Sequence, residues 1–193
     1  RMTQRPGTDE LWIGDVGWNA WEEINRVIAP ASTTASNFGW PCYEGASAQS
    51  GYQGAGLAQC SSLYSTPGSV AAPYYAYHHG ACVVSYSGCR TGGSSITGIA
   101  FYQGGSYPSQ YNGAVFFGDH SRNEIWAMLP GTNGLPDPSR LQSFVGVDAS
   151  EAMLESAREL DREHRVEWVQ ADLREWDPAS LGQAPDVVVT SST

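Results

Sequence analysis

Residues 111–128 read YNGAVFFGDHSRNEIWAM, and this stretch decides the fold class of most of the chain. An apolar run ends at Phe117-Gly118-Asp119, the polar residues Ser121-Arg122-Asn123 follow, and a partner strand is expected over Glu124–Leu129. The same pattern occurs at residues 11–15 (LWIGD). Two repeats of about 50 residues fit between the two patterns, the size of four-stranded propeller blades. We therefore expect an all-β fold of antiparallel hairpins with long loops.

Further strands and loops are expected between these two stretches. Residues 96–102 (ITGIAFY) read as a strand, and the aromatic residues 74–77 precede a pair of histidines. The Gly-, Gln- and Ser-rich residues 49–59 read as a surface loop.

The composition changes sharply near Phe144. Twenty of the 22 glycines and all four cysteines come before this point, whereas the remainder is rich in Glu and Arg. Two compositions so clearly separated predict two structural units, residues 1–144 and residues 145–193.

Bulk properties exclude several classes of function. The net charge of −10 and the absence of Lys argue against nucleic-acid binding. No apolar run approaches the roughly 20 residues that span a bilayer, and no signal peptide opens the chain. Because Arg1 is not a natural first residue, we expect that the N-terminus has been cut.

The four cysteines, Cys42, Cys60, Cys82 and Cys89, favour disulfides and an extracellular or periplasmic location. Three pairings are possible, of which Cys42–Cys60 with Cys82–Cys89 closes the shortest loops. Unpaired buried thiols are the alternative, and a zinc site is disfavoured because no CxxC pair exists.

Four motifs resemble one family in its own order. They are GDVGWNAWEEIN (14–25), NFGWPCYEG (37–45), SSITGIAFYQG (94–104) and YNGAVFFGDHSRNEIWAM (111–128). Residues 9–144 resemble the soluble quinoprotein sugar dehydrogenases of the glucose/sorbosone dehydrogenase type, which are six-bladed β-propellers. The resemblance implies about three blades of such a propeller. It also implies a secreted or periplasmic protein that uses pyrroloquinoline quinone (PQQ) and calcium to oxidise a sugar.

The resemblance also assigns candidate site residues. The backbone carbonyls that hold the cofactor's calcium match Gly17 and Trp18, and the side chains that bind a structural calcium match Glu22 and Glu23. Carboxylate and carbonyl oxygens are the ligands that calcium prefers. The alternative is that the two glutamates are solvated turn residues.

Much of the family's active site has no counterpart. Where the family can have a Lys that contacts the quinone, this sequence has Ser94 and Ser95. The resemblance also implies that the catalytic His and further Arg residues lie outside this chain. We therefore expect no catalytic residue and no complete active site.

Two pairs of neighbouring residues contain histidine and could carry chemistry. His78 and His79 invite a metal or general-base role, but neighbours on a strand point to opposite faces, which favours a structural or surface role. Asp119 followed by His120 is interpreted as a turn-capping Asp rather than an acid–base pair.

Residues 145–193 show a strand–helix–strand–strand pattern, typical of an α/β Rossmann-like fold. Their motifs GVDASEAMLESAR (146–158), VQADLREWDP (169–178) and PDVVVTSS (185–192) resemble class I S-adenosylmethionine-dependent methyltransferases of the trans-aconitate branch. The resemblance implies that Asp148 binds the cofactor's ribose hydroxyls. It further implies that Asp172 binds the adenine amino group and that Leu173 packs on the ring. An N-cap for Asp148 and a loop acid for Asp172 are the alternatives.

The interpretation that accounts for most of the sequence is a chimera of two fragments. The first is a quinoprotein sugar dehydrogenase fragment, expected to be inactive as written, with a small-molecule sugar as its partner. A methyltransferase fragment, whose parent would be cytoplasmic, and a non-catalytic secreted β-propeller binding module are the alternatives.

Overall fold

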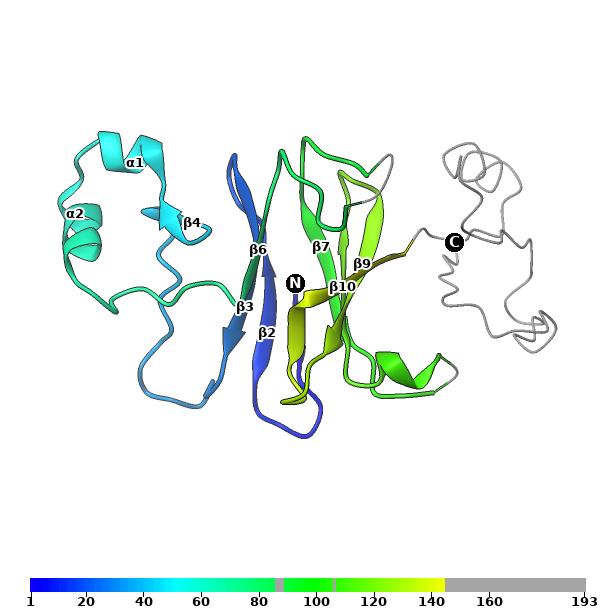
Figure 1. Cartoon of the computed structure of the whole chain (residues 1–193). Coiled ribbons are helices and arrows are strands. Elements are labelled where there is room, and N and C mark those ends of the chain that lie inside the picture. The colour runs from blue at the N-terminus through cyan, green and yellow to red at the C-terminus, as the bar shows by residue number, and fades with distance from the viewer. Residues whose placement is uncertain (86–88, 106, 145–193) are drawn as a thin grey trace. The chain divides into compact units, whose positions relative to one another are not determined.

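The computed structural model describes residues 1–85, 89–105 and 107–144, and these residues are mostly β (Figure 1). Their contacts divide them into two compact units. The first comprises Arg1–Phe101 and Val115–Asn123, and the second comprises Tyr102–Ala114 and the described chain from Glu124 onward. None of the helices in the described part is long and apolar enough to cross a membrane.

The first unit is built on a four-stranded antiparallel sheet in the order β1-β2-β3-β6. Its strands are β1 (Met2–Gln4), β2 (Leu11–Asp15), β3 (Trp21–Val27) and β6 (Tyr75–His78). In β2, Trp12 and Gly14 are buried while their neighbours are more accessible, as expected for a strand with one covered face. The predicted strand over residues 11–15 is therefore confirmed.

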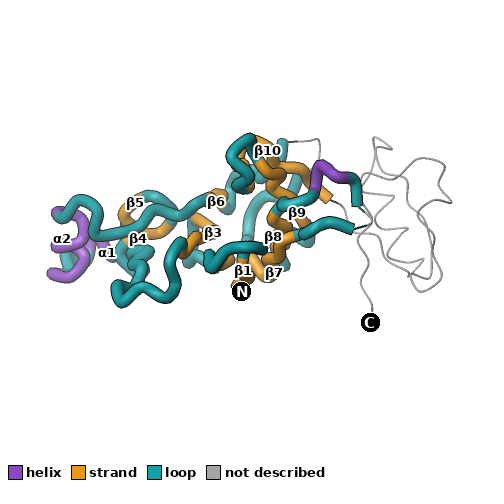
Figure 2. The backbone as a smooth tube through the Cα atoms, turned by 90° about the horizontal axis from the view of Figure 1, so that it is seen from below, coloured by secondary structure: helices purple, strands orange, loops and turns teal. Residues whose placement is uncertain are grey.

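A long excursion separates β3 from β6. It carries the short hairpin of β4 (Tyr43–Glu44) and β5 (Ser47–Ala48), then helices α1 (Ser50–Gly54) and α2 (Ala58–Ser65). The excursion is cyan in Figure 1, and its helices are purple in Figure 2. The prediction of a surface loop over residues 49–59 is wrong, because α1 and the start of α2 lie there. Gln49 caps α1, because its side-chain oxygen accepts a hydrogen bond from the Tyr52 N–H at 3.0 Å.

The first unit also contains the antiparallel hairpin of β7 (Ile96–Phe101) and β8 (Val115–Asp119). Both strands were expected, and β8 ends at Asp119 as the sequence pattern indicates. The core of this unit is aromatic. Trp12 has no exposed surface, and the centroid of its ring lies 4.5 Å from that of Tyr74 and 5.3 Å from that of Phe101. Such edge-to-face pairs stabilise a core beyond the area they bury.

The second unit contains η1 (Ser109–Tyr111) and the antiparallel pair β9 (Glu124–Pro130) and β10 (Pro136–Phe144). Its buried side chains include Tyr111, Trp126 and Met128. The Tyr111 hydroxyl donates a hydrogen bond to the Gln142 side-chain oxygen at 2.8 Å, which ties η1 to β10.

Candidate functional site

Glu44 organises the loop between β2 and β3. This residue of β4 is 4% exposed, and its Oε1 accepts hydrogen bonds from four successive backbone N–H groups. The donors are Trp18 (2.9 Å), Asn19 (2.9 Å), Ala20 (2.8 Å) and Trp21 (3.0 Å). Burial by itself would raise the pKa of the Glu44 carboxyl, but the four hydrogen bonds outweigh it and lower the pKa. The loop is therefore wrapped around an anion supplied by the protein itself.

Two glycines make this wrapping possible. A Cβ on Gly17 would lie 1.6 Å from the Trp21 carbonyl oxygen, and a Cβ on Gly45 would lie 2.9 Å from the Trp21 ring. Gly45 also has a φ of +64°, a conformation that other residues rarely adopt. Only glycine fits at position 17 without moving the backbone.

The carbonyls assigned to the cofactor's calcium lie in this same loop. Within the described part of the chain, no hydrogen bond ends on the carbonyl oxygen of Gly17 or Trp18. The N–H groups of the loop converge on Glu44. Their role toward calcium stays a prediction.

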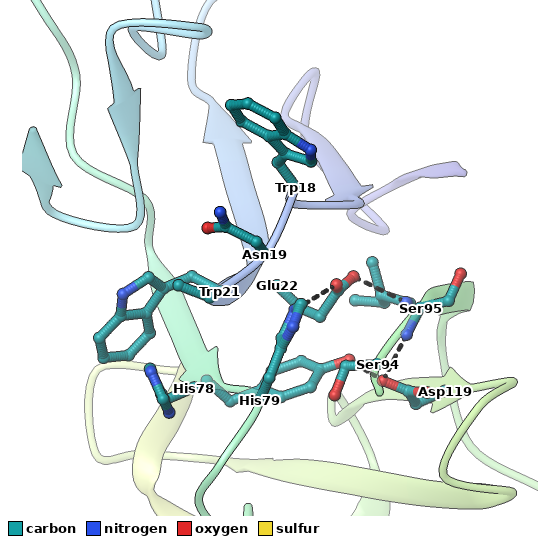
Figure 3. Close-up of polar contacts among 12 residues, drawn as sticks. Trp18, Asn19, Trp21, Glu22, His78, His79, Ser94, Ser95 and Asp119 are labelled. Carbon is teal, nitrogen blue, oxygen red and sulfur yellow. Dashed lines mark hydrogen bonds and ion pairs between the residues drawn. The ribbon is translucent and has the colours of Figure 1, made fainter. Parts of the chain in front are cut away.

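Glu22 is completely buried on β3 and connects two other segments (Figure 3). Its Oε1 lies 2.9 Å from the His79 Nε2, and its Oε2 accepts a hydrogen bond from the Ile96 N–H at 2.9 Å. Burial is the main cause that raises the pKa of this carboxyl, although both hydrogen bonds act in the opposite direction.

Glu23 has different partners from Glu22. Its Oε1 accepts from the Gly45 N–H at 2.6 Å, and its Oε2 accepts from the Asn25 side-chain amide at 3.1 Å. Burial again raises the pKa. The alternative of solvated turn residues is wrong for both glutamates, because both lie in a strand and are buried. Their joint role in holding a structural calcium stays a prediction.

The two histidines lie on either side of the end of β6 and have different neighbours. The ring of His78, the last residue of the strand, lies 5.0 Å from the Trp21 ring, and its Nδ1 accepts from the Gly80 N–H at 2.9 Å. His79 instead pairs with Glu22. Figure 3 shows the two rings pointing in different directions.

Asp119 ends β8 and caps the turn after it, as expected. Its Oδ1 accepts from the Arg122 N–H at 3.0 Å. Its Oδ2 accepts from the Tyr77 hydroxyl at 2.8 Å and from the Ser95 N–H at 3.0 Å. Burial, followed by the charge of Asp119, raises the pKa of the Tyr77 hydroxyl, so this group stays a proton donor.

Arg122 was not singled out from the sequence, although it is almost completely buried. Its guanidinium donates to the carbonyl oxygens of Ala81 (2.8 Å) and His78 (2.9 Å) and to the Ser94 hydroxyl (2.7 Å). Its carbon centre lies 5.1 Å from the Tyr77 ring centroid, a cation–π distance. These contacts join segments that lie far apart in the sequence, so no local sequence pattern predicts that Arg122 is buried.

The two disulfides Cys42–Cys60 and Cys82–Cys89 are present, so one of the three possible pairings is confirmed. Among the described residues no cysteine is free, and no three side chains of His, Cys, Asp or Glu are grouped to hold a metal ion.

The residues expected to bind S-adenosylmethionine, Asp148, Asp172 and Leu173, lie outside the described residues. Their roles, the α/β fold of residues 145–193 and the domain boundary near Phe144 stay predictions.

Comparison with known proteins gives one weak likeness. No protein-family model matches the chain, and no curated protein matches it. The chain is similar in structure to the PQQ-bound form of an aldose sugar dehydrogenase from Streptomyces coelicolor, with a TM-score of 0.42 and 16% sequence identity. The match covers 74% of this chain but only 29% of that protein. A likeness of this strength assigns no role to any residue here.

Proposed function

We propose that residues 9–144 are part of a quinoprotein sugar dehydrogenase-type propeller, and that the loop at Gly17 and Trp18 forms one wall of its calcium and PQQ site. The observation that carries this proposal is the fixed loop. Four of its N–H groups are held by Glu44, while two neighbouring carbonyl oxygens have no hydrogen-bond partner in the described residues.

The donor set fits calcium in kind and only partly in number. Calcium takes about six to eight oxygen ligands, and backbone carbonyls are common among them. Two carbonyls supply a minority of that number, so the quinone's own oxygens and water would complete the shell. When bound, the quinone would supply the two-electron oxidation of a sugar hydroxyl.

The protein's own part in this site is positioning. Glu44 fixes the loop, and the absence of a side chain at position 17 lets the backbone pass close to Trp21. We propose that this region contributes to binding of calcium and quinone. The two disulfides favour an oxidising, extracytoplasmic location.

The test is a titration of the purified chain with PQQ in the presence of calcium, followed by tryptophan fluorescence. We expect saturable quenching that EDTA abolishes. Gly17→Ala should weaken binding at least about tenfold because the added Cβ displaces the loop. Gly54→Ala is the matched control, since a Cβ there meets no atom within 4 Å.

Urea unfolding of both variants separates loss of the loop from loss of the fold. The proposal fails if the wild-type chain shows no calcium-dependent quenching, or if a folded Gly17→Ala variant binds as well as Gly54→Ala.

A further inference from the structure

Three large aromatic side chains form a cluster on the surface of the first unit, which we call the aromatic triad: Trp18, Trp40 and Tyr52. The ring centroids lie 6.3 Å (Trp18–Trp40), 5.8 Å (Trp18–Tyr52) and 6.4 Å (Trp40–Tyr52) apart. Trp18 is 57% exposed and Trp40 is 55% exposed. Figure 3 shows the Trp18 ring pointing away from Glu22 and His79. Tyr52 is half-buried beside the two tryptophans. Neighbouring exposed tryptophans are uncommon on a protein surface and often mark a binding site.

Each member of the triad is fixed by its own backbone. The loop that carries Trp18 is held by Glu44. Trp40 follows Gly39, whose φ is +90° and whose N–H donates to the Asn37 side chain at 2.9 Å. The N–H of Tyr52 donates to the side chain of Gln49. A surface whose backbone is already ordered loses little conformational entropy when a ligand binds.

The charge of the surrounding sequence indicates the kind of ligand. From Val27 to Cys89, Glu44 is the only Asp, Glu, Lys or Arg, although the whole chain has 30 such residues. Glu44 is buried and its Oε1 is occupied by backbone N–H groups. Trp40 and Tyr52 lie within this stretch, whose polar groups are, apart from Glu44, His78 and His79, hydroxyls and amides. Trp18 lies in the preceding segment, between the exposed Asp15 and the buried Glu22 and Glu23. An anionic partner would therefore lose water here without gaining an opposite charge.

We propose that the aromatic triad is a binding site for an uncharged saccharide chain. The C–H faces of a pyranose ring pack against aromatic rings through dispersion, and its hydroxyls hydrogen-bond to neutral hydroxyl and amide groups. The rings stand at 61° to 87° to one another, so they present faces in different directions. This arrangement suits a flexible soluble chain and not the flat surface of a crystalline polysaccharide.

The triad and the proposed calcium site share Trp18 but use different atoms of it. The triad uses the side chain of Trp18, whereas the proposed calcium site uses the backbone carbonyl of the same residue. Saccharide binding in EDTA, without PQQ, therefore tests the triad and leaves the proposed quinone site untouched.

The experiment is a titration of the full chain with maltohexaose and cellohexaose in EDTA, measured by isothermal calorimetry. We expect binding of at least one hexasaccharide. Trp40→Ala and Tyr52→Ala should each weaken it about tenfold or more, while Trp40→Phe keeps part of the affinity. Leu57→Ala, at an exposed apolar residue of the same uncharged stretch, should leave the affinity within about twofold. Hexagalacturonate and chitosan hexamer serve as anionic and cationic probes and should bind more weakly.

Three results would overturn the proposal. The first is that neither neutral hexasaccharide binds the wild-type chain. The second is that correctly folded Trp40→Ala and Tyr52→Ala variants bind saccharide as well as Leu57→Ala does. The third result is a self-associating wild-type chain in sedimentation velocity that Trp40→Ala makes monomeric and that saccharide does not dissociate. In that case the triad is an interface between two copies of the chain.

Discussion

The most informative substitution is Glu44→Gln, which removes one charge and keeps the size and shape of the side chain. In the wild-type protein one carboxylate oxygen accepts four backbone hydrogen bonds of 2.8 to 3.0 Å. Hydrogen bonds to a charged group stabilise a protein by about 1 kcal/mol more than neutral ones. Because four donors share one oxygen, we expect a total loss of about 2 to 4 kcal/mol rather than four full increments. That is a large share of the roughly 5 to 15 kcal/mol that keeps a domain folded.

Urea unfolding at pH 7 measures the loss, and Asp9→Asn, an exposed site, is the control for the change in net charge. The pH dependence gives a second measurement. Since the folded-state pKa of Glu44 is lowered, its contribution is fully present above its ordinary pKa and disappears as the pH falls through the folded value. The wild-type chain should therefore lose more stability than Glu44→Gln between pH 7 and low pH. A urea midpoint for Glu44→Gln equal to that of Asp9→Asn would refute the reasoning.

Three further predictions concern the same unit. Glu23→Gln should raise the urea midpoint at pH 7, because burial raises the pKa of Glu23 and makes its ionised form unfavourable in the folded protein. The variant should lose this advantage in acid, where the wild-type carboxyl is protonated, and a difference that stays the same across pH would contradict this. Trp12→Ala should cost about 3 to 5 kcal/mol in urea unfolding because the ring is fully buried, and a loss below about 1 kcal/mol would show that the aromatic core is not essential. Removing the Cys42–Cys60 disulfide, which closes a separation of 18 residues, should cost about 3 kcal/mol, and an unfolding curve unaffected by reducing agent would exclude this contribution.

Sequence patterns predicted the elements whose stability is local. The apolar run at Leu11–Asp15 forms β2, and the run before Asp119 forms β8, because alternation over a few residues suffices to define a strand with one buried face. The prediction of a loop over residues 49–59 failed for a related reason. The stretch is rich in Gly and Ser, yet a single side chain, that of Gln49, supplies the cap that starts α1.

The contacts that define the candidate site could not be predicted in this way. Glu44 binds N–H groups 23 to 26 positions away in sequence, and Glu22 reaches Ile96 from 74 positions away. Both glutamates occur in motifs of the sugar dehydrogenase resemblance, but nothing in the motifs gives their partners. The aromatic triad was missed because its members come from three separate segments.

The buried acids of the first unit have one common feature that bears on calcium. Glu22, Glu23, Glu44 and Asp119 each accept a backbone N–H from a segment distant in sequence. These bonds join segments of the first unit that lie far apart in the sequence. An N–H group that lost its carboxylate acceptor to calcium would cost about 1 to 3 kcal/mol, although a carboxylate can also bind the ion through a lone pair that no N–H uses. A calcium ion on the carbonyls of Gly17 and Trp18, which accept no hydrogen bond from the described residues, displaces no N–H group. We therefore propose the backbone of this loop as the candidate for the metal.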